Sequence, residues 1–204
     1  MDKYKKLDLF TLELGSDLCL EKCLNEILKT IPLIRGEIFD KYGVAIPSIR
    51  IRENKKLKPL EYVIKVNGFG SGRFEFRKNS FLILETGFVK TEMSGKPAKE
   101  PVFGVPGLWI TKGRKAEAEK NGYVVLPFSR IIRVHLSETI KENLSSVITT
   151  QYVGELLDEV LKGNEFLCTQ IVKKYGNASL TVVKQVLCSL LDEEVSIRNL
   201  IPIF

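Results

Sequence analysis

The chain has 204 residues, a length that suits one large domain or two small ones. Hydrophobic residues make up 44% and charged residues 27%, which is ordinary for a soluble protein with a full-sized core. No apolar run approaches the roughly 18 residues of a membrane-spanning helix, and the segment Met1–Lys6 does not begin a secretory signal.

The net charge of +6 is unevenly distributed along the chain. Residues 1–80 carry 16 Lys/Arg and 11 Asp/Glu, whereas residues 148–204 carry 5 and 7. The basic front either attracts an anionic partner or is an ordinary solvated surface. The cysteines show no CxxC spacing, so we expect buried free thiols in a reducing compartment; they are Cys19, Cys23, Cys168 and Cys188.

An α/β unit is predicted at the front of the chain. Residues 9–14 form a strand closed by Gly15. Because Pro32 lacks a backbone N–H, the first helix should end near Thr30, and a second helix should run from Pro32 to Gly43. The hydrophobic period then changes from 3.6 to 2, which predicts strands over 49–52, 61–66, 72–76 and 81–85.

The segment 87–107 is rich in glycine and proline, which predicts a long irregular connection of the kind that is usually functional or mobile. A strand over 108–110, a helix over 112–121, a strand over 123–126 and a helix capped by Ser129 follow. From residue 150 onward the pattern is helical throughout, with helices expected over 152–161, 165–175 and 180–191.

Catalytic motifs are weak in this sequence. His135, the single histidine, sits in a helical pattern and is expected to be a packed or hydrogen-bonded residue. The glycines of 68–72 lack the Lys-Ser/Thr and the helix of a phosphate-binding loop, so they predict a hairpin or bulge. The basic strands followed by Phe69, Phe74 and Phe76 leave an RNA-binding α/β module as the alternative function.

Several segments together resemble one known family. The stretch Ile49–Asn54 and the stretch Glu61–Gly68, with Leu57 and Pro59 between them, resemble the pattern IRDN…L.P.EYRIKIKG of the FHIPEP family. These proteins are the large export-gate subunits of flagellar and virulence type III secretion systems. The similarity covers about residues 10–200, looks more flagellar than virulence-type, and continues through Lys99–Ile110, Gly122–Val125, the His135-Leu136 pair and Val195–Leu200.

The resemblance implies an α+β fold of several subdomains. An α/β first subdomain would cover 10–79 and 128–147, a small second subdomain would be inserted at 80–127, and an incomplete all-helical third would cover 148–204. The family's membrane part is not in this chain, so the resemblance implies the cytoplasmic domain of an inner-membrane protein. The apolar end Ile201–Phe204 is unsuited to an exposed tail, and we expect a further segment after it.

In the family, this domain forms a ring resembling a nonamer, receives export chaperones with their substrates, and helps to set the order of export. Its other partners are export-apparatus proteins, including the ATPase complex. The resemblance implies neither catalysis, nor a cofactor or metal, nor a nucleic-acid partner. Flagellar members bind chaperones in a hydrophobic dimple between the first two subdomains, and the matching positions here are Glu100, Phe103 and Val134, a valine replacing the family's threonine.

Two interpretations of the matched residues remain open. Phe103 either fills the core of the inserted subdomain or is an exposed aromatic anchor for an amphipathic chaperone helix. Glu100 is either a solvated loop carboxylate or the partner of a cation on the bound protein. The position of Phe103 in a proline- and glycine-rich connection favours exposure.

Overall fold

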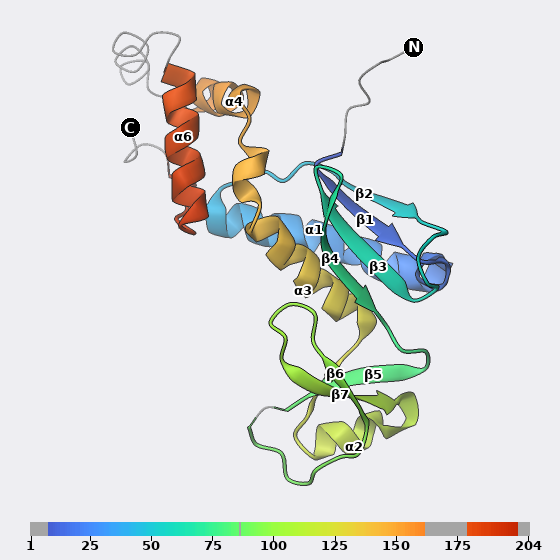
Figure 1. Cartoon of the computed structure of the whole chain (residues 1–204). Helices are drawn as coiled ribbons and strands as arrows, with labels where there is room; N and C mark the ends of the chain where they lie inside the picture. Colours follow the sequence, from blue (N-terminus) through green and yellow to red (C-terminus); the bar gives the residue numbers. More distant parts are fainter. Residues whose placement is uncertain (1–7, 86, 162–178, 200–204) are drawn as a thin grey trace. The chain divides into compact units, whose positions relative to one another are not determined.

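The computed structural model describes residues 8–85, 87–161 and 179–199, and divides into two compact units (Figure 1). The first is built from residues 1–32 and 49–139, and the second from residues 33–48 and 140–204. The mixture of sheets and helices confirms the α+β class, whereas the boundaries of three subdomains stay a prediction. None of the helices in the described ranges combines the length and apolarity needed to span a membrane.

The first sheet of unit 1 has four strands in the order β2-β1-β3-β4. Strands β1 and β2 are parallel, and the other two pairs are antiparallel. The glycines of 68–72 lie in the β3–β4 hairpin, which has a register shift at Ile64/Lys65, so the predicted hairpin with a bulge is confirmed. The strands span Phe10–Leu14 (β1), Ile49–Glu53 (β2), Glu61–Val66 (β3) and Phe69–Glu75 (β4).

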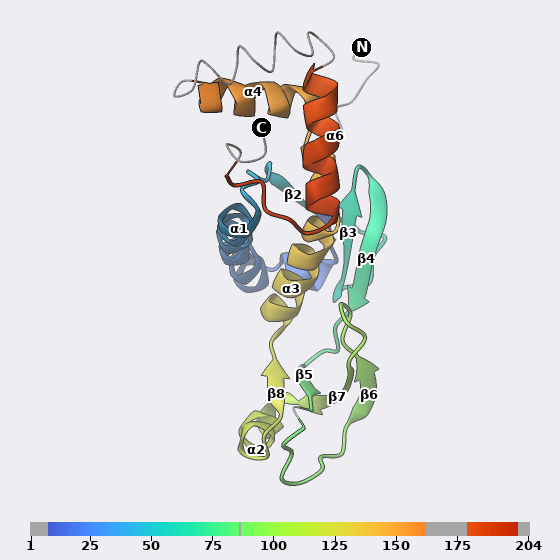
Figure 2. The ribbon, with the colours of Figure 1, turned by 90° about the vertical axis from the view of Figure 1, so that its left-hand side faces the viewer.

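One face of this sheet is the core of unit 1. Leu12 pairs with Ile64 and Leu14 with Tyr62, and all four side chains are buried. Helix α3 (Phe128–Lys141) lies against this face, and its residue His135 is hydrogen-bonded to Tyr62 of β3 (Figure 2). The helix begins one residue before Ser129, so the predicted cap at that position is wrong.

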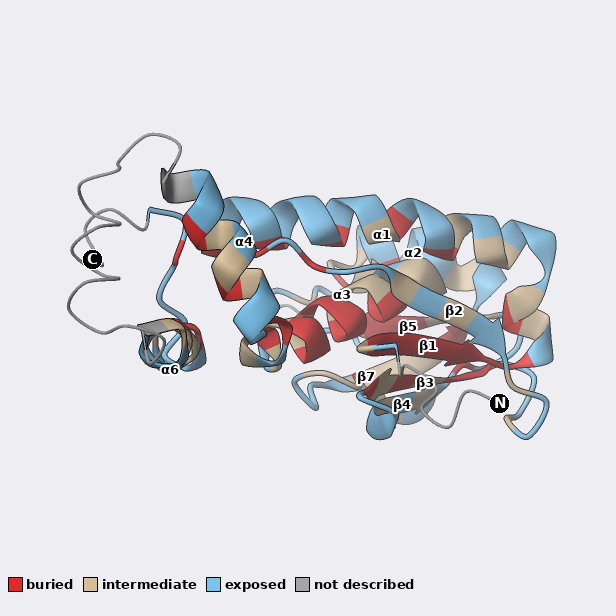
Figure 3. Cartoon of the chain, turned by 90° about the horizontal axis from the view of Figure 1, so that it is seen from above, coloured by how far each residue is buried: buried red, intermediate tan, exposed pale blue. Residues whose placement is uncertain are grey.

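The other face of strand β1 buries a carboxylate. Glu13 pairs in register with Arg52 of β2, and its carboxylate accepts hydrogen bonds from Arg52, Lys65 and Asn54. Burial raises the pKa of Glu13, but these hydrogen bonds outweigh burial and lower the pKa to about 2. The aliphatic stems of the basic side chains help to cover the strand, and Figure 3 shows β1 as buried and β2 as largely exposed.

The second sheet of unit 1 has the order β6-β7-β5-β8 and is antiparallel throughout. The 3₁₀ turn Lys112–Arg114 and helix α2 (Lys115–Lys120) follow β7, and Ala118 of α2 packs in the sheet's core with Ile83 and Tyr123. Strand β6 falls inside the segment 87–107, which is therefore not irregular throughout. The strands span Ser80–Leu84 (β5), Lys96–Lys99 (β6), Pro106–Thr111 (β7) and Val124–Leu126 (β8).

Helix α1 (Glu21–Tyr42) is continuous through Pro32, which contradicts the prediction of two helices. The 3₁₀ turn Ser16–Cys19 precedes it. Proline removes one backbone hydrogen bond, but Ile27, Ile34 and Ile38 are fully buried at helical spacing on both sides of it. Packing of this stripe outweighs the lost hydrogen bond.

Unit 2 combines the end of α1 with helical elements from the back of the chain. The backbone N–H of Ile197 donates to the Tyr42 carbonyl at 3.0 Å, and the Tyr152 hydroxyl accepts from the Ala45 N–H at 3.0 Å. The helix predicted over 165–175 lies outside the described residues. The elements are Leu144–Val147 (a 3₁₀ turn), Thr150–Leu161 (α4) and Ser179–Asp192 (α6).

The cysteines of the described ranges are free thiols, as expected, but Cys19, Cys23 and Cys188 are only half-buried. Burial nevertheless raises the pKa of all three thiols. Cys168 lies outside the described residues.

Candidate functional site

The loop between strands β6 and β7 holds two of the three predicted site residues. It is closed by two backbone hydrogen bonds, from the Glu100 N–H to the Val105 carbonyl at 2.9 Å and from the Gly104 N–H to the Glu100 carbonyl at 3.1 Å. Gly104 has a φ of 67°, a left-handed conformation that favours glycine. The loop is therefore a defined turn with internal hydrogen bonds.

Glu100 is buried at 6% exposure, so the expectation of a solvated loop carboxylate is wrong. Its carboxylate accepts hydrogen bonds from the Val102 N–H at 3.0 Å and from the Phe103 N–H at 2.8 Å. These two amides have no strand partner in the turn, and the carboxylate satisfies them from inside the loop. Glu100 therefore shapes the turn, whereas its role in binding a partner stays a prediction.

Phe103 projects from this turn with 70% of its surface exposed. The favoured exposure is thus found, and the alternative that Phe103 fills the core of the second sheet is wrong, because that core is formed by other residues, including Ile83, Met93 and Ile110. A large aromatic side chain in water is unfavourable by itself, and here its backbone is fixed by the Glu100 carboxylate. The arrangement is that of a preorganised apolar anchor.

Val134, the third predicted residue, is half-buried in α3, beside the buried His135. Burial lowers the pKa of His135, and the negative charge of Glu100 acts in the opposite direction. That charge also adds to burial in raising the pKa of Tyr62. The Glu100 carboxylate therefore lies near the Tyr62–His135 pair, and Figures 1 and 2 show the β6–β7 loop beside α3.

Tyr62 and Gly72 lie near this site and were not predicted as supporting residues. The Tyr62 hydroxyl and His135 Nδ1 share a hydrogen bond of 2.7 Å, and the imidazole lies so close to Gly72 that an added Cβ would be 2.5 Å from Nε2. A glycine inside a strand indicates close approach of another group, and this was the available signal for Gly72. Nothing in the local sequence points to the long-range pairing of Tyr62 with His135.

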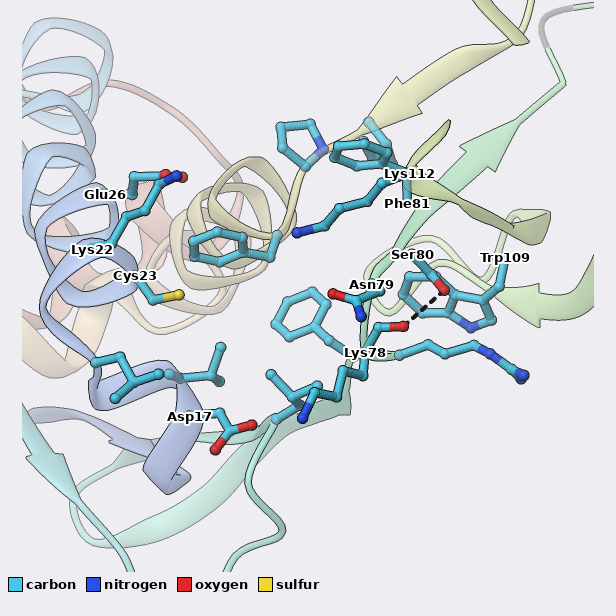
Figure 4. Close-up of a pocket in the computed structure, with 18 of the residues that line it drawn as sticks. Asp17, Lys22, Cys23, Glu26, Lys78, Asn79, Ser80, Phe81, Trp109 and Lys112 are labelled. Atoms are coloured by element: carbon cyan, nitrogen blue, oxygen red, sulfur yellow. Dashed lines mark hydrogen bonds between the residues drawn. The ribbon is translucent and has the colours of Figure 1, made fainter. Parts of the chain in front are cut away.

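A recess lies elsewhere in unit 1, where none of the three predicted residues contributes to the lining. It consists of two cavities, of about 500 Å³ and about 690 Å³, which share part of their lining, and Figure 4 shows residues that line the first of them. Within the described ranges, His, Cys, Asp and Glu side chains form no group of three or more that could hold a metal ion. The features of unit 1 suited to binding are thus an exposed aromatic turn and an open recess.

The chain belongs to the FHIPEP family, whose pattern it matches over residues 1–204. It is similar to the flagellar biosynthesis protein FlhA of Borreliella burgdorferi, with 36% identity over 201 residues, 97% of this chain and 28% of that protein. FlhA of Helicobacter pylori is 34% identical over 206 residues, 100% of this chain and 28% of that protein. The chain thus spans just over a quarter of the length of these relatives.

Solved structures share the fold at lower sequence identity. The CdsV protein of Chlamydia pneumoniae superposes with a TM-score of 0.81 at 20% identity, covering 98% of this chain and 60% of that one. The nonameric EscV cytosolic domain from a type III secretion system gives a TM-score of 0.68 at 17% identity, covering 100% and 58%. The fold is therefore that of type III secretion cytosolic domains.

Proposed function

We propose that this chain is the cytoplasmic part of a type III protein export gate, of the flagellar kind, and that it acts as a docking platform for export chaperone–substrate complexes. Membership of the FHIPEP family and the similarity to two FlhA proteins support this proposal. Its activity is the binding of other proteins rather than catalysis. The order in which chaperones dock helps to set the order in which their substrates are exported.

The exposure of Phe103 is the observation that carries the docking proposal. Aromatic side chains dominate the binding energy of protein interfaces when they enter an apolar recess of the partner. Phe103 stands on a turn that its own protein has already ordered, so little entropy is lost when it is bound. An amphipathic chaperone helix would place its apolar face over Phe103, and the half-buried Val134 would extend that surface along α3.

Assembly into a ring and contact with other export-apparatus proteins belong to the same proposal. Two solved structures with this fold are described as nonameric, those of EPEC SctV-C and of the EscV cytosolic domain, and CdsV was solved in a complex with CdsO. The protein would be anchored in the inner membrane by segments outside this chain. Analytical ultracentrifugation of the membrane-anchored protein, solubilised in detergent, would measure the size of the ring.

The Phe103→Ala variant tests the docking site. We expect it to weaken binding of the cognate chaperone–substrate complex by roughly 1–3 kcal/mol, measured by isothermal titration calorimetry, because truncation removes the apolar anchor. Phe69→Ala is the matched control, since Phe69 is 78% exposed at the tip of the β3–β4 hairpin. Equal affinities of the folded variants would remove Phe103 from the docking site, and no binding by the unaltered chain would contradict the docking function itself.

A further inference from the structure

The recess in unit 1 is formed by two neighbouring cavities that share part of their lining. The 500 Å³ cavity is bounded by the start of α1, the β4–β5 connection, β7 and the start of α3. The 690 Å³ cavity extends it past β4 to β6. Six residues line both cavities, namely Asp17, Leu60, Phe76, Arg77, Lys78 and Trp109. The two cavities together run from α1 past β4 to β6, an extent along which a length of extended chain can lie.

The floor of the recess is apolar. Leu18 and Phe76 are buried beneath it, and Phe81, Trp109 and Phe128 line it while half-buried. Figure 4 shows Phe81 and Trp109 on the side of the recess that the second sheet forms. Partly exposed aromatic surface in a concave site favours apolar side chains of a ligand, because burying them removes apolar area from water.

The rim of the recess is basic: Lys115 is paired with Glu119, whereas the other lining cations form no ion pair in the part of the chain that the structure describes. Lys22 stands on α1 and Lys112 follows β7, and Figure 4 shows the Lys112 side chain extending from the second sheet toward α1. Six lining cations form no ion pair with any side chain in the described ranges, namely Lys22, Arg77, Lys78, Lys96, Lys99 and Lys112. This positive rim attracts a ligand with several negative charges.

The opposing carboxylates are too few to balance this rim. Asp17, Glu26 and Glu75 line the recess, and Glu75 is already paired with Lys58. The chain's own first residues are a poor occupant, because the segment 1–6 carries three lysines and one aspartate. A nucleic acid would match the charge, but Phe74 is stacked on one face of the Trp109 ring, with the ring centroids 6.1 Å apart, so this ring offers a base at most one face.

We infer that this recess is a second docking site, separate from the Phe103 loop, and that it binds an acidic segment of a partner protein whose carboxylates flank apolar side chains. The apolar side chains occupy the floor formed around Trp109 and Phe76. The carboxylates pair with Lys22, Lys112 and the cations of the β4–β5 connection. Binding is electrostatically steered and weakens as ionic strength rises.

Trp109 is the single tryptophan of the chain and lines both cavities, so its fluorescence reports on the recess. The probe is a short synthetic peptide without tryptophan, in which leucine and phenylalanine are separated by pairs of glutamates. We expect this peptide to change the Trp109 emission saturably, and a peptide with lysine in place of glutamate to leave it unchanged. A glutamate peptide that causes no saturable change would overturn the inference.

The double variant Lys22→Glu/Lys112→Glu tests the basic rim. We expect it to bind the glutamate peptide about tenfold more weakly, because two favourable charge interactions become repulsive. Lys29→Glu/Lys120→Glu is the matched control, since these exposed lysines lie on α1 and α2 but do not line the recess. Equal weakening in the control would show a general charge effect and contradict a site at the recess.

Two further titrations distinguish this inference from chaperone docking at Phe103 and from RNA binding. Phe103→Ala should bind the glutamate peptide normally, so that loss of chaperone docking in that variant and loss of peptide binding in the double variant are independent results. Oligouridylate should bind at least tenfold more weakly than the peptide at the same ionic strength, since phosphates leave the apolar floor uncovered. Equal or tighter binding of the RNA would overturn the assignment to an acidic protein segment.

Discussion

At the scale of single residues, Glu100 shows how a matched position can act indirectly. Its carboxylate faces inward, holds the amides of Val102 and Phe103, and keeps the neighbouring ring exposed. A partner would then touch Phe103, while Glu100 sets the position of that side chain. The acidic motif suggests that Glu100 contacts the partner, but here Glu100 is a positioning residue for the adjacent aromatic anchor.

The Glu100→Ala variant should loosen the β6–β7 turn without unfolding the sheet. The amides of Val102 and Phe103 lose their acceptor, so we expect faster hydrogen exchange at both positions and weaker chaperone binding. Exchange measured by nuclear magnetic resonance gives the result for each amide. Lys99→Ala, at the neighbouring exposed position, is the control, and unchanged exchange at Phe103 in Glu100→Ala would contradict the proposed role of the carboxylate.

Gly72 offers a second test at this scale. A methyl group there would approach His135 Nε2 to 2.5 Å, so Gly72→Ala should force the imidazole away and disturb its hydrogen bond with Tyr62. We expect a loss of roughly 1–3 kcal/mol in the free energy of unfolding, measured by urea denaturation. Gly70→Ala, in the same strand with nothing within 4 Å of its added Cβ, should be close to neutral. Equal losses in the two variants would argue against this close packing.

At the scale of elements, strand β1 makes unit 1 sensitive to acid. The pKa of Glu13 is about 2 in the folded chain, against 4.5 for the free side chain. The folded state therefore holds this proton less tightly than the unfolded state. The resulting stabilisation is complete above pH 4.5 and is lost as the pH falls toward about 2.

Glu13→Gln should remove this contribution, which is at most about 3 kcal/mol from the size of the pKa shift. Urea unfolding at pH 6 and pH 3 should show a smaller pH-dependent loss in the variant than in the unaltered chain. Glu53→Gln, at an exposed residue of β2, is the control. The same pH dependence in Glu13→Gln and in the unaltered chain would show that the buried carboxylate is not responsible.

Local patterns predicted most strands and helices because each depends on periodicity within a few residues. The strand-forming segments around Leu12 and Ile64, and the helix over 180–191, were found in this way. The effect of Pro32 on the helix was predicted wrongly. The loss of one backbone hydrogen bond can be read from the sequence, but the burial of Ile34 and Ile38 that outweighs this loss depends on tertiary packing.

The same distinction applies to the binding surfaces. Exposure of Phe103 was favoured by the composition of its loop, but the inward carboxylate of Glu100 depends on the folded turn. The recess gathers Lys22, Lys78 and Lys112 from three separate parts of the chain, and each lysine by itself reads as an ordinary surface residue. Rules based on residue spacing cannot detect such a site, because its residues do not lie on one periodic helix or strand.

At the scale of the whole molecule, the chain presents two dissimilar binding surfaces on unit 1. One is a convex turn with an exposed ring, and the other is a concave recess with an apolar floor and a basic rim. A convex anchor and a concave recess require partners of opposite shape, so they need not compete for one ligand. If both proposed sites bind as inferred, the chain could hold two different partner segments at once.

The division of the chain also bears on the order in which the protein folds during synthesis. Residues 33–48 belong to the second unit, yet the rest of that unit begins only at residue 140, after nearly all of unit 1 has been made. Ile197 reaches Tyr42 across 155 residues, a contact that closes a long loop. Unit 1 can thus be complete before the rest of unit 2 has been made, whereas the end of α1 gains its contact with Ile197 only after that later segment emerges.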